Sequence, residues 1–128
     1  MIKITEELFK KSIIAQKDDD DYEESGYVVL NIDNTIYLFD YSHCSCYSTF
    51  EVITDFNDQS YNDEGDKEAN IDIMPLFEGS IEDFKAMAIH KSDLHMPERK
   101  SHLDDCDYEK LHSVYTQFLK WLEVEESK

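Results

Sequence analysis

The fold is decided by residues 27–41, which read YVVLNIDNTIYLFDY. Both halves of this stretch are rich in β-branched and aromatic residues, which favour extended strands. Between them stands Asp33-Asn34, a pair of residues that tolerates turn conformations. The stretch therefore predicts a β-hairpin with strands over residues 27–32 and 35–41.

The elements outside the hairpin follow from the spacing of apolar residues. Near-helical spacing predicts a first helix over residues 4–16, and alternating side chains predict a third antiparallel strand over 49–56. A serine followed three positions later by an aspartate predicts a second helix over 80–91. Apolar residues at three- and four-residue steps from 111 to 122 predict a long C-terminal helix. We expect an α+β fold in which a small antiparallel β-sheet of about three strands packs against about three α-helices.

Two acidic segments interrupt these elements. Mutual repulsion among carboxylates predicts a solvated linker over residues 17–25 and a long surface loop over 57–75. The chain has 128 residues, of which 41% are hydrophobic, so there is enough apolar material for one core. We expect a single domain over residues 1–128.

The charge balance restricts the kinds of partner. Thirty acidic residues against twelve basic ones give a formal net charge of −18, which repels nucleic acid and anionic lipid. We therefore expect a basic protein partner, no direct nucleic-acid binding and no membrane association. The alternative is that the charge merely keeps the chain soluble. Three cysteines, an odd number, fit a reducing intracellular compartment.

One short segment has the composition of a metal site. His43, Cys44 and Cys46 fall within four positions, and thiolates and imidazoles are the ligands that zinc prefers. A structural zinc site needs four ligands, and Cys106 is the best candidate for one from elsewhere, because it is the other thiol in the chain. The remaining candidates are His90, His95, His102 and His112. The competing interpretation is that the cysteines are reduced and some of them simply buried.

Other chemistries have weaker support in the sequence. A nucleophilic Cys44 or Cys46 with His43 as its base lacks an accompanying oxyanion-forming motif, so we expect no enzyme, although a thiol- or metal-dependent enzyme stays an alternative. Residues 55–66 partly match the ligand spacing of a calcium-binding EF-hand loop. The match lacks the glycine at position six, where Ser60 stands, and the glutamate at position twelve, where Asp66 stands.

The thiol-rich segment also carries a resemblance. Residues 27–52, with the run SHCSCY at 42–47, resemble small phage and mobile-element proteins that have a His-Cys-Ser-Cys-Tyr loop after a hairpin. Together with its size and acidity, the chain is similar to the zinc-containing type II-A anti-CRISPR proteins of streptococcal phages. The resemblance implies a zinc site that includes His43, Cys44 and Cys46. It also implies an acidic surface that inhibits a type II CRISPR nuclease by hindering target-DNA loading, in the cytoplasm of an infected bacterial cell.

The physical case for such a target is independent of the resemblance. RNA-guided nucleases hold the guide–target duplex in a positively charged channel, which complements a chain of charge −18. A DNA mimic that binds another basic host protein is the alternative that the same charge supports.

Overall fold

The structure, a computed structural model, describes residues 2–18, 23–44, 48–87 and 105–128. Its centre is a four-stranded antiparallel sheet in the order β2-β3-β4-β6. These strands are β2 (Ile13–Asp18), β3 (Glu23–Ile32), β4 (Thr35–Cys44) and β6 (Phe77–Ser80). A second, two-stranded antiparallel sheet pairs β1 (Lys3–Thr5) with β5 (Glu68–Asn70). The expected α+β class is confirmed.

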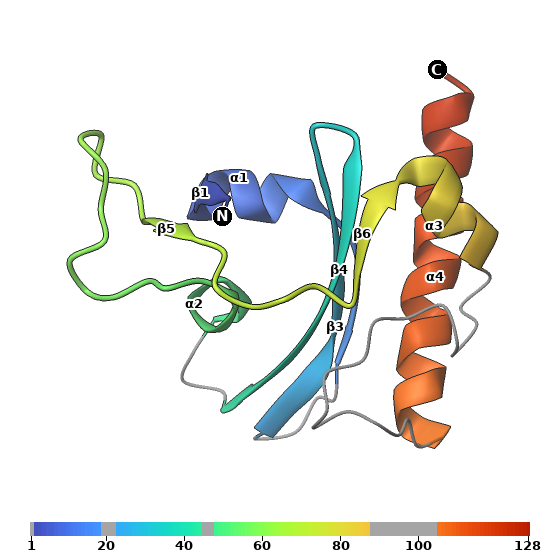
Figure 1. Ribbon diagram of the computed structural model, residues 1–128, viewed down its shortest axis with the longest axis horizontal. Coiled ribbons are helices and arrows are strands. Elements are labelled where there is room, and N and C mark those ends of the chain that lie inside the picture. Colours follow the sequence, from blue (N-terminus) through green and yellow to red (C-terminus); the bar gives the residue numbers. More distant parts are fainter. Residues whose placement is uncertain (1, 19–22, 45–47, 88–104) are drawn as a thin grey trace.

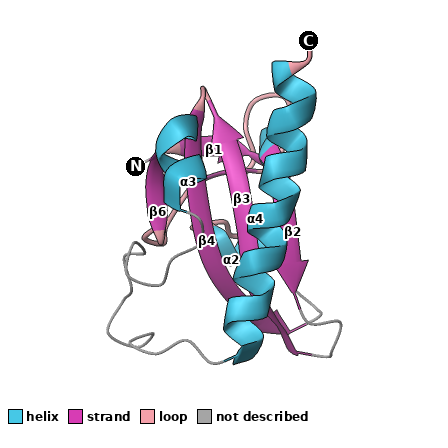
Figure 2. Cartoon of the chain, turned by 90° about the vertical axis from the view of Figure 1, so that its right-hand side faces the viewer, coloured by secondary structure: helices cyan, strands magenta, loops and turns pink. Residues whose placement is uncertain are grey.

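Helices cover both faces of the central sheet (Figures 1 and 2). On one face lie α3 (Ile81–Met87) and the long α4 (Asp105–Glu126). On the other face lie α1 (Glu6–Ser12) and α2 (Thr49–Ile53), together with the small sheet. Each face has its own buried cluster. Between the sheet and helices α3 and α4 lies a cluster that includes Val29, Leu38 and Phe118. Between the sheet and helices α1 and α2 lies a cluster that includes Val28, Phe39 and Phe50.

The predicted hairpin is the longest strand pair in the structure. Every position from Glu23 to Ile32 is paired with one from Cys44 to Thr35. Asp33 and Asn34 have φ values of 52° and 66°, which is the combination that a two-residue type I′ turn requires. The strands therefore extend beyond the predicted limits of 27 and 41. They include residues 23–25, so the predicted acidic linker over 17–25 is wrong for these residues.

The segment from Thr49 to Phe56 was predicted as a strand, and that prediction was wrong. It begins with helix α2, because Ser48 and Glu51 form a capping box at its N-terminus. The Ser48 hydroxyl accepts from the Glu51 N–H at 3.2 Å, and the Glu51 carboxylate accepts from the Ser48 N–H at 3.4 Å. Residue 54 leaves the helix and makes an isolated bridge with Ile71.

The predicted helix over 4–16 is shorter in the structure and lies between two strands. Thr5 caps α1 by accepting a hydrogen bond from the Leu8 N–H, and the helix ends at Ser12. Ile13 begins β2, which pairs with β3 from Ile13 to Asp18 with a shift of register between Ile13 and Ala15. Pairing with a neighbouring strand therefore overrides the local helical spacing of residues 13–16. Lys17 and Asp18 also belong to β2 and not to a linker.

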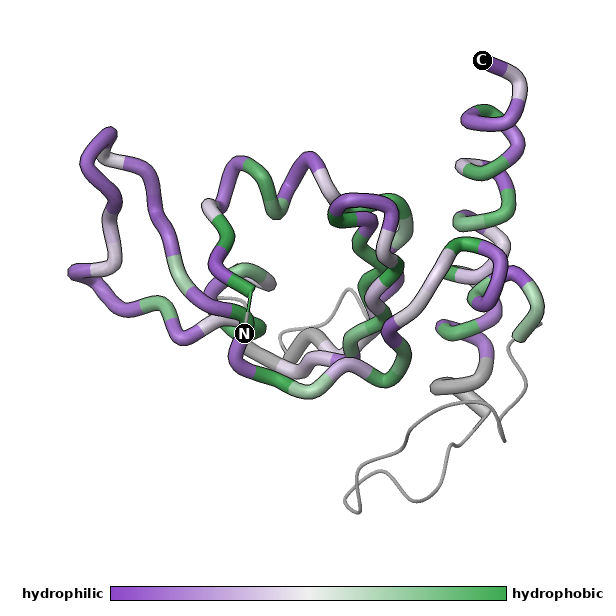
Figure 3. Tube along the Cα trace, turned by 45° about the horizontal axis from the view of Figure 1, so that its top comes forward, coloured by the Kyte–Doolittle hydropathy of each residue, from purple (hydrophilic) through white to green (hydrophobic). Residues whose placement is uncertain are grey.

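The other expectations differ in their limits. The helix predicted over 80–91 is described over 81–87, and the C-terminal helix extends from 105 to 126. In the predicted acidic loop over 57–75, the part before β5 projects from the domain, and its hydrophilic course contrasts with the apolar strands in Figure 3. After β5 the chain returns to the domain, and Ile71 is buried in the cluster under α1 and α2. Within the described ranges, no helix is both long and apolar enough to span a lipid bilayer.

Candidate functional site

The predicted zinc ligands can be placed by backbone register at one end of the sheet, which we call the Cys44 end. There β4 finishes at Cys44, which is paired with Glu23 at the start of β3. Helix α4 begins at the same end, because the Lys110 ammonium donates to the Ser25 carbonyl at 3.0 Å. Cys106 precedes Lys110 by about one helical turn. The topology therefore brings Cys44 and the first turn of α4 to the same end of the molecule.

The other predicted zinc ligands are less well placed for a shared metal site or lie outside the residues that the structure describes. His43 and Cys44 are consecutive positions of regular strand, paired with Glu24 and Glu23. Such positions belong to opposite faces of a sheet, and the expected loop starting at Ser42 does not form before Cys44. Cys46, His90, His95 and His102 lie outside the described residues, and His112 is on the exposed side of α4. Among the residues that the structure describes, no group of three or more His, Cys, Asp or Glu side chains could hold a metal ion.

A polar network that the sequence did not reveal lies at the Cys44 end, on the α2 side of the sheet. The Tyr41 hydroxyl donates to Asp18 Oδ2 at 2.7 Å and accepts from Gln16 Nε2 at 2.8 Å. The same Gln16 amide donates to Thr49 Oγ1 at 3.3 Å, which connects β2 to α2. Burial raises the pKa of Tyr41, and the Asp18 carboxylate raises it further. The phenol therefore stays protonated and can serve as a structural donor.

On the α4 side, a glutamine side chain occupies the open edge of the sheet. The Gln16 N–H donates to Gln117 Oε1 at 3.2 Å, and Gln117 Nε2 donates to the Gln16 carbonyl at 3.1 Å. Since β2 is an edge strand, this amide occupies the backbone N–H and carbonyl of Gln16, which a neighbouring strand would otherwise pair with. Asp40 and Lys110 are also buried on this side, with 6% and 8% exposure. Among the side chains that the structure describes at the Cys44 end, Gln16, Asp18, Tyr41 and Gln117 thus serve internal cohesion.

The opposite end of the molecule carries exposed carboxylates, and we call it the acidic end. The pairing of Thr35 with Ser80 brings the hairpin turn beside the start of α3, and the ring of Phe84 packs edge-to-face against Phe118 of α4. The C-terminus of α4 lies at this same end (Figure 1). The exposed carboxylates of the acidic end are Asp33, Glu78, Glu82, Asp83, Glu123, Glu125 and Glu126. Within the described ranges, Glu125 is the member of this set that has a lysine partner, Lys128.

Many of the lysines are engaged elsewhere. Lys10 and Lys11 of α1 pair with Glu6 and Glu7 one turn earlier, at 3.7 and 2.9 Å. On the small sheet, Lys3 pairs with Glu68 at 3.4 Å. Exposed pairs of this kind add little stability. Their consequence is electrostatic, because they balance carboxylates around α1, whereas the seven exposed carboxylates of the acidic end outnumber the exposed lysines of α3 and α4.

The calcium-like spacing in residues 55–66 has a structural explanation. Asp55 accepts hydrogen bonds from both the backbone and the side-chain nitrogen of Asn70, at 2.8 and 3.3 Å. Asn62 Oδ1 accepts from the backbone N–H groups of Glu64 and Asp66. These side chains hold the projecting loop in shape by bonds within the chain.

The fold and these two ends define an acidic α+β protein in which helices cover both faces of an antiparallel sheet. Among the side chains that the structure describes, a hydrogen-bonded polar cluster lies at one end and a set of exposed carboxylates at the other. Comparison of the chain with protein-family models, with curated proteins and with solved structures gives no match.

Proposed function

We propose that this protein is a binding protein without catalytic activity, which docks on a basic protein partner through its acidic end. The observation that carries the proposal is the set of carboxylates contributed there by the hairpin turn, β6, α3 and α4. The lysines of α1 and β1 are paired with glutamates and leave these charges unbalanced. Opposite charge on a partner would steer association and set the orientation of docking.

The first partner to test is a type II CRISPR RNA-guided nuclease, in the cytoplasm of an infected bacterial cell. Such a nuclease offers a positively charged channel for the guide–target duplex. An acidic protein that occupies or covers this channel would hinder the loading of target DNA. The resemblance of the chain to anti-CRISPR proteins in size, acidity and the thiol-rich run at 42–47 supports the same partner.

The test is target-DNA cleavage by a purified, guide-loaded nuclease, with the protein added before or after the DNA. Inhibition is expected when the protein is added first and is lost when the DNA is already loaded. Neutralising Glu82, Asp83 and Glu123 together should weaken inhibition at least tenfold. Neutralising Asp58, Asp63 and Glu64 in the projecting loop removes the same amount of charge and should change it less than threefold. Capture of a different basic host protein by the acidic end, without nuclease inhibition, would favour the wider DNA-mimic role.

We further propose a structural zinc ion at the Cys44 end, with Cys44 and Cys106 as ligands. Their elements meet at this end, and zinc would cross-link strand to helix through thiolate ligands. Metal analysis of protein purified without added zinc should give about one equivalent. Cys44→Ser and Cys106→Ser should each lose the metal and lower the midpoint of thermal unfolding. His112→Asn should keep the metal and leave the midpoint unchanged. Well below one equivalent in the unmodified protein would contradict the site.

A further inference from the structure

A small pocket opens on the α1 side of the central sheet, between β4, β6 and residues 71–75. Its cavity volume is about 210 Å³. Pockets for whole small molecules usually measure about 300–1,000 Å³, so this one suits a single side chain better than a cofactor. It is lined by Ile2, Tyr37, Phe39, Ile71, Ile73, Pro75 and Glu78.

The walls of the pocket are apolar and aromatic. The rings of Tyr37 and Phe39 are parallel, with an interplanar angle of 2° and centroids 6.1 Å apart. Isoleucines 71 and 73 and a proline complete the walls. Aromatic rings attract cations, and aliphatic walls accept the methylene stem of a long basic side chain.

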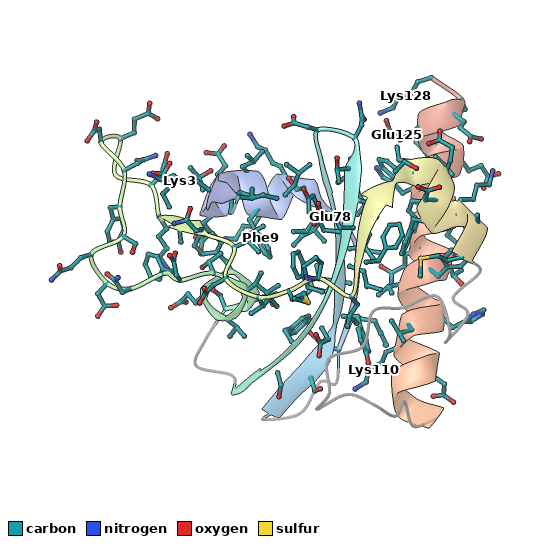
Figure 4. All side chains as sticks on the ribbon, in the orientation of Figure 1. Lys3, Phe9, Glu78, Lys110, Glu125 and Lys128 are labelled. Atoms are coloured by element: carbon teal, nitrogen blue, oxygen red, sulfur yellow. The ribbon has the colours of Figure 1, made fainter. Side chains whose placement is uncertain are left out.

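The polar end of the pocket has two groups that lack partners among the described residues. Glu78 is paired with Tyr37 across β4 and β6, so both side chains lie on the same face of the sheet (Glu78 is labelled in Figure 4). The Glu78 carboxylate is exposed and makes no ion pair with any lysine that the structure describes. The side chain of Tyr37 is largely buried, but its hydroxyl reaches solvent and makes no hydrogen bond within the described ranges.

The electrostatics at this point favour a cation. Burial raises the pKa of Tyr37, and the charges of Glu78 and Asp33 raise it further. Both carboxylates therefore act on the hydroxyl that lines the pocket. Because the lining residues include Glu78 and no lysine or arginine, an entering positive charge meets attraction without a competing cation in the lining.

We propose that this pocket is an anchor site for one arginine side chain of the basic partner. This inference rests on the proposed function and assigns one contact within it. The stem of the arginine packs against Ile71 and Ile73, and its guanidinium donates to the Tyr37 hydroxyl and the Glu78 carboxylate. Arginine suits the site better than lysine, because a planar guanidinium has five donors and can bond two acceptors while it stacks on an aromatic ring.

The test is a titration of ¹⁵N-labelled protein with acetyl-arginine methylamide, followed by NMR. The amide resonances of Ile2, Tyr37, Ile73 and Glu78 should shift together. The citrulline analogue, which has nearly the same shape without the charge, should bind at least fivefold more weakly, and the lysine analogue at least threefold more weakly. Glu78→Gln should weaken arginine binding at least fivefold, Tyr37→Phe about threefold, and the control Glu64→Gln, in the projecting loop, less than twofold. The thermal midpoint of each variant verifies that it is folded.

The outcomes separate this inference from the proposed function. Shifts centred on Glu82, Asp83 and Glu123, or no shifts at all, would overturn the anchor site, while capture of the nuclease or another basic protein would leave the proposed function standing. Equal binding of the citrulline or lysine analogue would overturn the assignment to arginine. If the pocket binds arginine but no basic protein is captured, the anchor site would stand as a cation site and the proposed function would be overturned.

Discussion

The two ends of the β3–β4 hairpin use polar residues in opposite ways. At the Cys44 end, Tyr41 bonds to Gln16 and Asp18, and the buried Lys110 bonds to the backbone of Ser25. At the acidic end, Glu82, Asp83 and Glu123 are exposed and make no ion pair with any lysine in the described part of the chain. The first set is satisfied within the fold, and the second is left for solvent or a partner.

This difference separates residues that stabilise the protein from residues that are available for binding. Removing a partner from a buried hydrogen bond costs about 1–3 kcal/mol, because the remaining group stays desolvated. Changing an exposed charge usually costs less than about 0.5 kcal/mol. Substitutions at the Cys44 end should therefore act on stability, and those at the acidic end on association.

The largest expected effect is that of Lys110→Met. Methionine keeps most of the buried stem but removes the ammonium that donates to the Ser25 carbonyl. We expect the free energy of unfolding to fall by about 2 kcal/mol, measured by denaturant unfolding. Lys85→Met, on the exposed side of α3, is the control and should change it by less than about 0.5 kcal/mol. Equal losses in the two variants would remove the distinction between the two ends.

The next effect is that of Tyr41→Phe. The substitution removes the Tyr41 donor to Asp18 and one of the two acceptors of Gln16 Nε2, so stability at neutral pH should fall by about 1–2 kcal/mol. Tyr61→Phe is the matched control, because its side chain is in an exposed loop and is 52% accessible. It should change stability by less than about 0.5 kcal/mol.

The raised pKa of Tyr41 gives this prediction a pH signature. In the unfolded chain the phenol loses its proton near its ordinary pKa of 10.0, whereas in the folded chain it retains the proton to higher pH. The folded state therefore binds more protons above pH 10, and its stability falls as the pH rises. The midpoint of denaturant unfolding between pH 8 and 11 should decline less steeply in Tyr41→Phe than in the unmodified protein. Parallel declines would show that Tyr41 does not carry the effect.

The elements that could be predicted from the sequence are those with strong local patterns. The hairpin has β-rich halves around a turn pair, and α4 has sustained helical spacing, so both were predicted correctly in kind. The strand expected over 49–56 failed because its alternation competed with a capping signal in the same residues. Ser48 and Glu51 are three positions apart, and this spacing could have revealed the helix.

The site depends on contacts between residues distant in the sequence. Tyr41 and Gln16 are 25 positions apart, and Lys110 and Ser25 are 85 apart. Tyr37 meets Glu78 because β6 adds to the edge of β4, and nothing in the composition of residues 77–80 indicates that pairing. Residue types alone could suggest the thiol cluster and the net charge. Which polar groups are hydrogen-bonded and which are exposed depends on the register of strand pairing, and that register could not be predicted from the sequence.

The smallest effect on stability should follow from neutralising the acidic end. Glu82→Gln, Asp83→Asn and Glu123→Gln together relieve like-charge repulsion. They also remove two carboxylates from the first turn of α3, each worth about 0.3–1 kcal/mol to a helix N-terminus. Because these terms oppose each other, the free energy of unfolding should stay within about 1 kcal/mol of the unmodified protein, and its dependence on salt should weaken. The measurement is denaturant unfolding at low salt and at about 1 M salt, where the Debye length is about 3 Å. A loss of 2 kcal/mol or more would place these carboxylates among the groups that hold the fold together. The acidic end would then have the same role as the Cys44 end.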